Sequence, residues 1–243
     1  MERKLKKGNM YENTKLWDPF VGCRFDCTYC VPSYKRQLKR VGGRIRCPDC
    51  REYKPHTHPE RLRILPSSSI IFVCGAADIR FCQPDYTRQI IDSIKRHKPR
   101  KEKTYYFQSK NPAYFNQFLD EFPDTVILLT TLETNRDEGY PTISKAPLPS
   151  RRFKEFYDLD YPRKVATIEP VMDFDLEQFS DWIIQLHEQG NLEYVWFGFN
   201  SKPKAVQLPE PSQEKAQEFI DILEGHEIIV KGKTIRDLKL MER

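Results

Sequence analysis

Short runs rich in apolar, β-branched and aromatic residues recur along this 243-residue chain, and each precedes a longer stretch whose apolar residues have helical spacing. The predicted strands are 70–74, 104–107, 125–130, 165–168 and 194–197. The helices predicted after them are 85–97, 112–121, about 149–158, 175–188 and 212–224. A strand before Cys23 and a helix after Cys30 bring the β/α repeats to six. This alternation predicts an α/β fold with parallel strands joined by right-handed crossovers.

The helical stretches also indicate which side chains face the core. Asp85 is the expected N-cap of the helix over 85–97. Apolar residues at helical spacing predict two buried stripes, which are Phe179, Trp182, Ile183 and Leu186 in one helix and Phe219, Ile222 and Leu223 in another. Periodicity alone permits either a barrel or a doubly wound sheet. In a barrel, the polar residues that end each strand would gather at one rim, where the chemistry sits.

Length and composition exclude several classes of protein. The longest apolar run, 70–77, has eight residues, whereas a membrane-spanning helix needs about 20. The charged residues 1–7 precede no apolar stretch, as a signal peptide would require, so we expect a cytoplasmic protein with no membrane partner. Seven cysteines are an odd number, which argues against a disulfide framework. We expect one domain over 1–243.

Positive charge is concentrated in the first half of the chain. Residues 1–110 hold 25 Lys and Arg against 11 Asp and Glu, a net charge of +14, whereas residues 111–243 have a net charge of −9. Such a basic half favours a polyanionic partner such as DNA or RNA, with Tyr34 and Tyr53 available to stack on bases. Ordinary solvated helix ends would explain the same charges.

Three cysteines occur within eight residues as C-x3-C-x2-C, at Cys23, Cys27 and Cys30. Thiolates this close in sequence can share one face of an iron–sulfur cluster, leaving one iron without a protein ligand. Electron-transfer clusters usually have four cysteine ligands, so three favour catalysis. A zinc knuckle, in which some of these cysteines pair with other ligands, is the alternative.

The pattern resembles the cluster signature of the radical S-adenosylmethionine (SAM) superfamily, C-x3-C-x-aromatic-C, with Tyr29 as the aromatic residue. The wider chain is similar to an uncharacterised phage and prokaryotic branch near spore photoproduct lyase. The motifs that carry this second resemblance lie between residue 17 and about residue 200. They are Trp17-Asp18-Pro19, Gly22-Cys23, 58–62 (HPERL), 75–78 (GAAD), 109–112 (SKNP), 131–135 (TLETN) and 168–170 (IEP).

The resemblance implies a partial (β/α)6 barrel and a [4Fe-4S] cluster held by Cys23, Cys27 and Cys30. The cluster would cleave SAM to methionine and a 5′-deoxyadenosyl radical, which abstracts hydrogen from a substrate. A flavodoxin- or ferredoxin-type donor would supply the electron. By strand position, the candidate SAM-binding residues are Gly75 to Asp78 for the amino group, Lys110 for the carboxylate, Glu133 or Asn135 for the ribose, and Glu169 for the outer edge. The sixth strand departs from the family by ending in Gly198-Phe199-Asn200, not in a Gly-Gly-Glu-like sequence.

A second group of metal-binding residues lies in a predicted insertion, 40–62, after the cluster loop. Cys47 and Cys50 form C-x2-C, and His56 and His58 follow within eight residues. These four side chains could complete a tetrahedral zinc shell, with Cys74 or Cys82 as a substitute for one histidine. Free thiols are the alternative, since a single C-x2-C is a weak signal.

Cys82 is the candidate catalytic residue outside the cluster loop. It follows the second predicted strand, so we expect it near the rim. Spore photoproduct lyase is similar in using a further cysteine to return a hydrogen atom to the substrate radical. A buried apolar role or a zinc-ligand role is the alternative for this thiol.

The chain as a whole is therefore predicted to be a radical SAM enzyme whose substrate is nucleic acid. The alternative is a protein without catalytic activity. A metal-binding nucleic-acid module would account for the same cysteines and basic charge.

Overall fold

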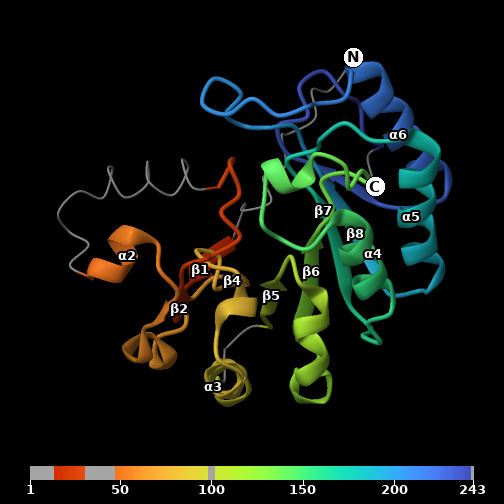
Figure 1. The fold of residues 1–243 in the computed structure, drawn as a ribbon. Helices are drawn as coiled ribbons and strands as arrows, with labels where there is room; N and C mark the ends of the chain where they lie inside the picture. The colour runs from red at the N-terminus through yellow and green to blue at the C-terminus, as the bar shows by residue number, and fades with distance from the viewer. Residues whose placement is uncertain (1–13, 31–46, 98–101, 242–243) are drawn as a thin grey trace.

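The computed structural model describes residues 14–30, 47–97 and 102–241. Seven parallel strands form one curled, half-barrel sheet, in the same order in space as in sequence (Figure 1). These strands are β1 (Thr14–Trp17), β4 (Ile70–Val73), β5 (Thr104–Gln108), β6 (Val126–Thr131), β7 (Lys164–Ile168), β8 (Leu192–Phe197) and β9 (Val230–Gly232). A doubly wound sheet reverses its strand order at a switch point. The described strands show no reversal, so the partial barrel is confirmed.

Within the described ranges, four α-helices cover the sheet, and Figure 1 shows three of them, α4, α5 and α6, side by side along one side of it. The helices are α3 (Pro84–Arg96), α4 (Pro149–Tyr157), α5 (Leu176–Glu188) and α6 (Gln213–Gly225). All four residues of the stripe predicted for α5 are buried. In α6, Phe219 and Leu223 are buried as predicted. Ile222 is only half-buried, and Ile220 is buried in its place. No helix of the described residues is long and apolar enough to cross a membrane.

The central strands are buried on both faces, because neighbouring residues of a strand point to opposite sides. Phe107 belongs to the large core cluster that includes the helix side chains, whereas Tyr106 belongs to a smaller cluster made by the other face of the sheet. In that smaller cluster the hydroxyls of Tyr106 and Tyr194 are 2.6 Å apart, which satisfies both polar groups. Burial on both faces explains why the strands read as continuous apolar runs.

Several predicted elements differ from the observed ones. Residues 112–121 form two short 3₁₀ helices, Pro112–Gln117 and Leu119–Glu121. There the amide of Phe118 donates to the carbonyl of Phe115 three residues earlier, a spacing that puts both rings in the core. Helix α3 begins at Pro84 after Gln83, so Asp85 lies in its first turn and is not its N-cap.

The number of strands also differs, since β9 adds a seventh to the six predicted. The helix predicted after Cys30, the aromatic Tyr34 and the first part of the insertion fall in 31–46, outside the described residues.

The described part of the insertion packs against the chain that leads into the cysteine motif. It contains α2 (Pro48–Glu52), β3 (His56–Thr57) and the 3₁₀ helix η2 (Pro59–Arg63). Strand β3 pairs antiparallel with β2 (Phe20–Val21), immediately before Cys23. At this junction Gly22 has φ of +102°, and a Cβ there would lie 2.2 Å from the carbonyl oxygen of Lys54. A glycine is therefore required for the two segments to meet.

Replacing Gly22 by alanine tests this close approach. The added Cβ would strain the backbone and push the Lys54 carbonyl away, so we expect a loss of unfolding free energy of about 2–4 kcal/mol. The measurement is chemical denaturation.

Gly190→Ala is the matched control, because Gly190 also has a positive φ, +74°, but an added Cβ would meet nothing within 4 Å. It should lose only about 1 kcal/mol. Equal losses in the two variants would contradict the proposed contact.

Candidate functional site

A cavity of about 550 Å³ opens at the carboxyl end of the parallel sheet. The cysteine loop forms one part of its wall, residues at the ends of β4 to β8 form another, and residues of β1, Tyr53 and Lys233 also contribute. Its polar and thiol-bearing lining includes Cys23, Cys27, Tyr29, Cys30, Asp78, Gln108, Lys110, Thr131, Thr167, Glu169, Asn200, Ser201, Lys202 and Lys233. A cavity of this volume is large enough for a cofactor or another small molecule.

The cysteine loop is held in place by its backbone. The amide of Cys30 donates to the carbonyl of Cys27 at 3.0 Å, which closes a turn. The amide of Thr28 donates to Ile143 at 2.9 Å, and the amide of Lys145 donates to Phe25 at 2.7 Å. The segment that precedes α4 thus fixes the loop, and all three cysteines line the cavity.

The three thiols differ in their electrostatic surroundings. A hydrogen bond from Cys30 lowers the pKa of Cys27 to about 5, with further help from Lys110, whose Nζ is 3.4 Å from the sulfur, and from Ser144, at 3.0 Å. Burial raises the pKa of Cys23, and the hydrogen bond to Cys27 raises that of Cys30. Cys27 is therefore the thiol most stabilised as a thiolate, the form that binds metals.

Beneath the loop lies a fully buried carboxylate, Glu133. Its Oε1 accepts a hydrogen bond from Lys110 Nζ at 2.5 Å and another from the hydroxyl of Tyr29. Its Oε2 accepts from Arg152 at 2.6 Å, and its Oε1 also accepts from the hydroxyl of Tyr140 at 3.2 Å. Burial raises the pKa of this carboxyl, but the two cations outweigh it and bring the pKa down to about 2.

This network uses two of the residues predicted to bind SAM. Glu133 is not part of the cavity lining and is occupied by its four partners. Lys110 does line the cavity, with its Nζ held between Glu133 and Cys27. Arg152, which could have been found from the sequence but was not, adds a second positive charge from α4.

Asp78 and Asn135 tie elements of the fold together. Asp78 accepts hydrogen bonds from the Ser109 hydroxyl at 2.7 Å and the Lys110 amide at 2.8 Å, and so joins the loops after β4 and β5. Asn135 lies outside the cavity lining and bonds to the amide of Asp175, at the start of α5, and to Gln178. Gly75 lines the cavity beside Asp78, as predicted from strand position.

Three polar residues from adjacent strands form a part of the cavity lining that the sequence analysis did not select. The amide of Gln108 donates to the hydroxyls of Thr131 at 2.7 Å and Thr167 at 3.2 Å. They lie on β5, β6 and β7, at the carboxyl end of each strand or one residue before it. Polar residues that end otherwise apolar strands are the signal that could have identified them.

Glu169 directly follows β7, lines the cavity and pairs with Lys233 at 2.7 Å. Burial raises its pKa. The neighbouring Gly198 belongs to the sixth-strand end that departs from the family pattern, and a Cβ there would lie 2.0 Å from the Lys233 carbonyl. Glycine at this position thus lets the chain that carries Lys233 approach Glu169.

The predicted zinc ligands lie together in a second site. Cys47, Cys50, His56 and His58 bring one ligand atom each to within 4.8 Å of one another. The Nε2 atoms of both histidines are 3.2 Å from the Cys50 sulfur, and that of His56 is 3.3 Å from Cys47. Burial lowers the pKa of His58, which favours its neutral, metal-binding form. Neither Cys74 nor Cys82 belongs to this group.

Cys82 lies apart from the cysteine loop. It is buried, lines a separate hollow of about 1150 Å³ and does not line the central cavity. Burial raises its pKa to about 11. Phe25 lines both spaces.

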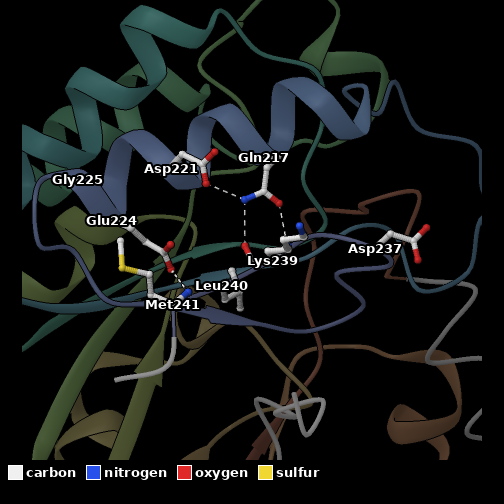
Figure 2. A pocket seen from close by; sticks show the side chains of 8 residues that line it. All are labelled: Gln217, Asp221, Glu224, Gly225, Asp237, Lys239, Leu240 and Met241. Atoms are coloured by element: carbon white, nitrogen blue, oxygen red, sulfur yellow. Dashed lines mark hydrogen bonds between the residues drawn. The ribbon is translucent and has the colours of Figure 1, made fainter. Parts of the chain in front are cut away.

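A third hollow, of about 610 Å³, lies between α6 and the chain that follows β9 (Figure 2). Gln217 exchanges hydrogen bonds with the backbone of Lys239, at 2.7 and 3.0 Å, and the amide of Met241 donates to Glu224. These contacts attach the C-terminal segment to α6, so the hollow has a structural explanation.

No protein-family model and no curated protein matches the chain. Among solved structures it is similar to one described as "Native anSMEcpe with bound AdoMet and Cp18Cys peptide", with 12% sequence identity and a TM-score of 0.47. The similarity covers 89% of this chain and 62% of that one, so the chain spans less than two thirds of that protein's length.

Glu133→Gln tests the buried network. The amide keeps the size of the side chain but leaves Lys110 and Arg152 without their counter-charge, so we expect a loss of about 3–5 kcal/mol of unfolding free energy at neutral pH. Glu121→Gln is the control, because its partly exposed pair with Arg88 should contribute less than about 1 kcal/mol.

The pH dependence of this difference gives an independent check. A depressed carboxyl pKa stabilises the fold above the ordinary value of 4.5, and the contribution disappears as the pH falls toward 2. The difference between wild type and Glu133→Gln should therefore shrink below pH 4.5. A difference that stays constant down to pH 2.5 would contradict the assigned charge state.

Proposed function

We propose that the chain is a radical SAM enzyme whose cluster and SAM occupy the central cavity. The observation that carries the proposal is the placement of Cys23, Cys27 and Cys30 in the wall of a cavity at the carboxyl end of a curled parallel sheet. Active sites of (β/α) barrels lie at this end.

The donor set fits a [4Fe-4S] cluster with one open iron. Among the described residues that line the cavity, the three loop cysteines are joined by no fourth cysteine and no histidine. A protein that holds an electron-transfer cluster usually supplies four thiolates. The three loop cysteines would hold the cluster, which, when bound with SAM beside it, would supply the electron for cleavage of SAM to methionine and a 5′-deoxyadenosyl radical.

The protein's own residues would then position SAM and keep water out. Lys110 holds positive charge beside Cys27, where it stabilises a ligating thiolate. The backbone of Gly75 to Ala77 is available to the amino group of SAM, and Gln108, Thr131 and Thr167 form a polar surface for its other groups. Glu169 contributes a carboxylate at the outer edge. A flavodoxin- or ferredoxin-type protein would be the electron donor.

Within this proposal, the residues assigned to the ribose of SAM change. Glu133 and Asn135 are occupied in the fold, so their part is to hold the elements that carry the site. Gln108 lines the cavity, and its amide oxygen can accept from a hydroxyl group, whereas the amide of Asn200 is bonded to Val206 and Lys202. Gln108 is therefore the better candidate to contact the ribose.

Nucleic acid is the proposed substrate, and the hollow lined by Cys82 supports this choice. It shares Phe25 with the central cavity, and its described lining contains four cationic residues and no carboxylate. Lys145 and Arg151 have acidic partners, so the uncompensated charge comes from the exposed Arg24 and Arg80. A phosphate backbone is the polyanion that such a surface would bind.

Within this substrate proposal, Cys82 is the candidate hydrogen donor. It lies in the wall of the same hollow, between the 3₁₀ turn Ile79–Phe81 and α3. Its thiol would give a hydrogen atom to the substrate radical and become a thiyl radical.

Anaerobic reconstitution with iron and sulfide tests the enzyme proposal. Wild type should gain a broad visible iron–sulfur absorption and release 5′-deoxyadenosine from SAM with dithionite. Alanine variants of Cys23, Cys27 or Cys30 should lose the iron–sulfur absorption. Their release of 5′-deoxyadenosine should fall to the level of a protein-free control.

Cys82→Ala is the matched control, because it should keep the absorption and the SAM cleavage while losing turnover of the true substrate. A wild-type protein that holds zinc alone and releases no 5′-deoxyadenosine would favour a non-catalytic nucleic-acid module and refute the enzyme proposal.

Binding of short single-stranded DNA or RNA, measured by fluorescence anisotropy at several salt concentrations, tests the substrate proposal. Arg24→Gln/Arg80→Gln should weaken binding and reduce the salt slope by about 2, one for each lost phosphate contact. Lys239→Gln, at the third hollow, should bind like wild type. No binding to the cluster-loaded wild type at low salt would redirect the proposal to a peptide or metabolite.

A further inference from the structure

The insertion between β2 and β4 contains a second cluster of ligating side chains, away from the central cavity. We propose that Cys47, Cys50, His56 and His58 bind one zinc ion, and that this ion fixes the segment leading into the cysteine loop. Four ligands on one zinc ion lie roughly 3.3–3.8 Å apart at tetrahedral geometry. The sulfur–nitrogen separations of 3.2–3.3 Å are close to that arrangement.

The outer hydrogen bonds of both imidazoles determine which nitrogen faces inward. Nδ1 of His56 is 2.7 Å from the Lys54 carbonyl, and Nδ1 of His58 is 2.9 Å from a Glu60 carboxylate oxygen. Both partners are acceptors, so each Nδ1 carries the proton and each neutral Nε2 presents a lone pair. Zinc-binding histidines are oriented in this way by their outer partners.

The two Nε2 atoms are only 2.8 Å apart. Two lone pairs at this distance repel each other unless a proton or a metal ion lies between them, and a proton would satisfy only the two nitrogens. Free thiols at Cys47 and Cys50 could each donate to a nitrogen, but that would leave the contact between the nitrogens unfavourable. A shared metal ion satisfies all four groups, so the geometry favours zinc over free thiols.

The local backbone is shaped to bring the ligands together. Cys47 precedes the first turn of α2, Pro48 begins the helix, and Cys50 follows one turn later. Tyr53, with φ of 58°, then ends the helix in the left-handed conformation and turns the chain toward β3. Four protein ligands close the shell, and closed shells are typical of structural zinc sites.

The zinc module is joined directly to the segment before Cys23. The amide of His58 donates to the carbonyl of Pro19 at 2.6 Å, and Val21 pairs with His56 between β2 and β3. Arg61 donates to the carbonyl of Asp18 at 2.8 Å. A zinc ion that fixes His56 and His58 therefore also fixes residues 18–22.

Metal analysis of the purified full-length chain tests the site. Wild type should contain one zinc per chain, and Cys50→Ser and His58→Ala should retain less than about a tenth of it. Cys74→Ala and Cys82→Ala should keep it in full, since these cysteines lie outside the group. Wild type without stoichiometric zinc, or zinc retained in the ligand variants, would overturn the site.

The ligand geometry can be checked by replacing zinc with Co²⁺. A tetrahedral thiolate–imidazole site gives intense visible bands for Co²⁺, whereas an octahedral surface site gives weak ones. Iron in place of zinc in these four ligands would also overturn the assignment. None of these measurements depends on SAM cleavage, so they remain informative if the proposed enzyme activity fails.

Hydrogen–deuterium exchange tests the link to the cysteine loop. In His58→Ala, or in wild type stripped with a zinc chelator, the amides of residues 18–25 should exchange about tenfold faster, whereas those of α5 should be unchanged. If the variant does not fold, the experiment with chelator-treated wild type still tests the link. Zinc loss with unchanged exchange over 18–25 would overturn the positioning role.

Discussion

The buried carboxylate of Glu133 is the interaction on which the rest of the site depends. It follows β6 and has partners in three other parts of the chain, namely Lys110 after β5, Arg152 in α4 and Tyr29 in the cysteine loop. A charge buried without partners would cost several kcal/mol, so these four residues must come together for any of them to be stable there. The fold and the position of the loop are thereby coupled.

The network has one more positive charge than negative charge, so a second anion beside it would be stabilised. Lys110 and Arg152 contribute two positive charges against the single negative charge of Glu133. Cys27 has its sulfur 3.4 Å from the Lys110 ammonium and a lowered pKa, so it can supply another negative charge. The same pair of cations thus balances a structural carboxylate and favours a thiolate in the cavity wall.

The sequence predicts the strands well because burial on both faces leaves continuous apolar runs, such as Val126–Thr131. It predicts 112–121 poorly because Phe115 and Phe118 suit a 3₁₀ spacing as well as an α-helical one. Strand β9 has only three residues, too few for any periodicity. The burial of Arg152 could have been predicted from the sequence. It lies four residues before the buried Phe156, so both side chains lie on the apolar face of α4.

Side-chain roles are harder to predict than positions, because partners distant in sequence decide them. Asp78 and Lys110 both lie at the rim as strand order predicts, but only the structure shows their ties to Ser109 and Glu133. For the second metal group, local sequence suffices, since all four side chains fall within twelve residues. Short loops leave little conformational freedom, and so their ligand geometry follows from spacing.

The two cysteine groups illustrate how neighbouring thiols acquire different chemistry. The pairing of β2 with β3 draws His56 and His58 to Cys47 and Cys50, where they complete a shell of four. No histidine lies among the described residues that line the cavity at Cys27, and its described surroundings offer a cation and hydroxyl groups instead. A shell closed by protein ligands suits a structural ion, whereas an incomplete one leaves room for an exogenous ligand. The close approach of Gly22 to Lys54 joins the segment before Cys23 to the Cys/His group, so in the proposed arrangement a closed metal site would support an open one.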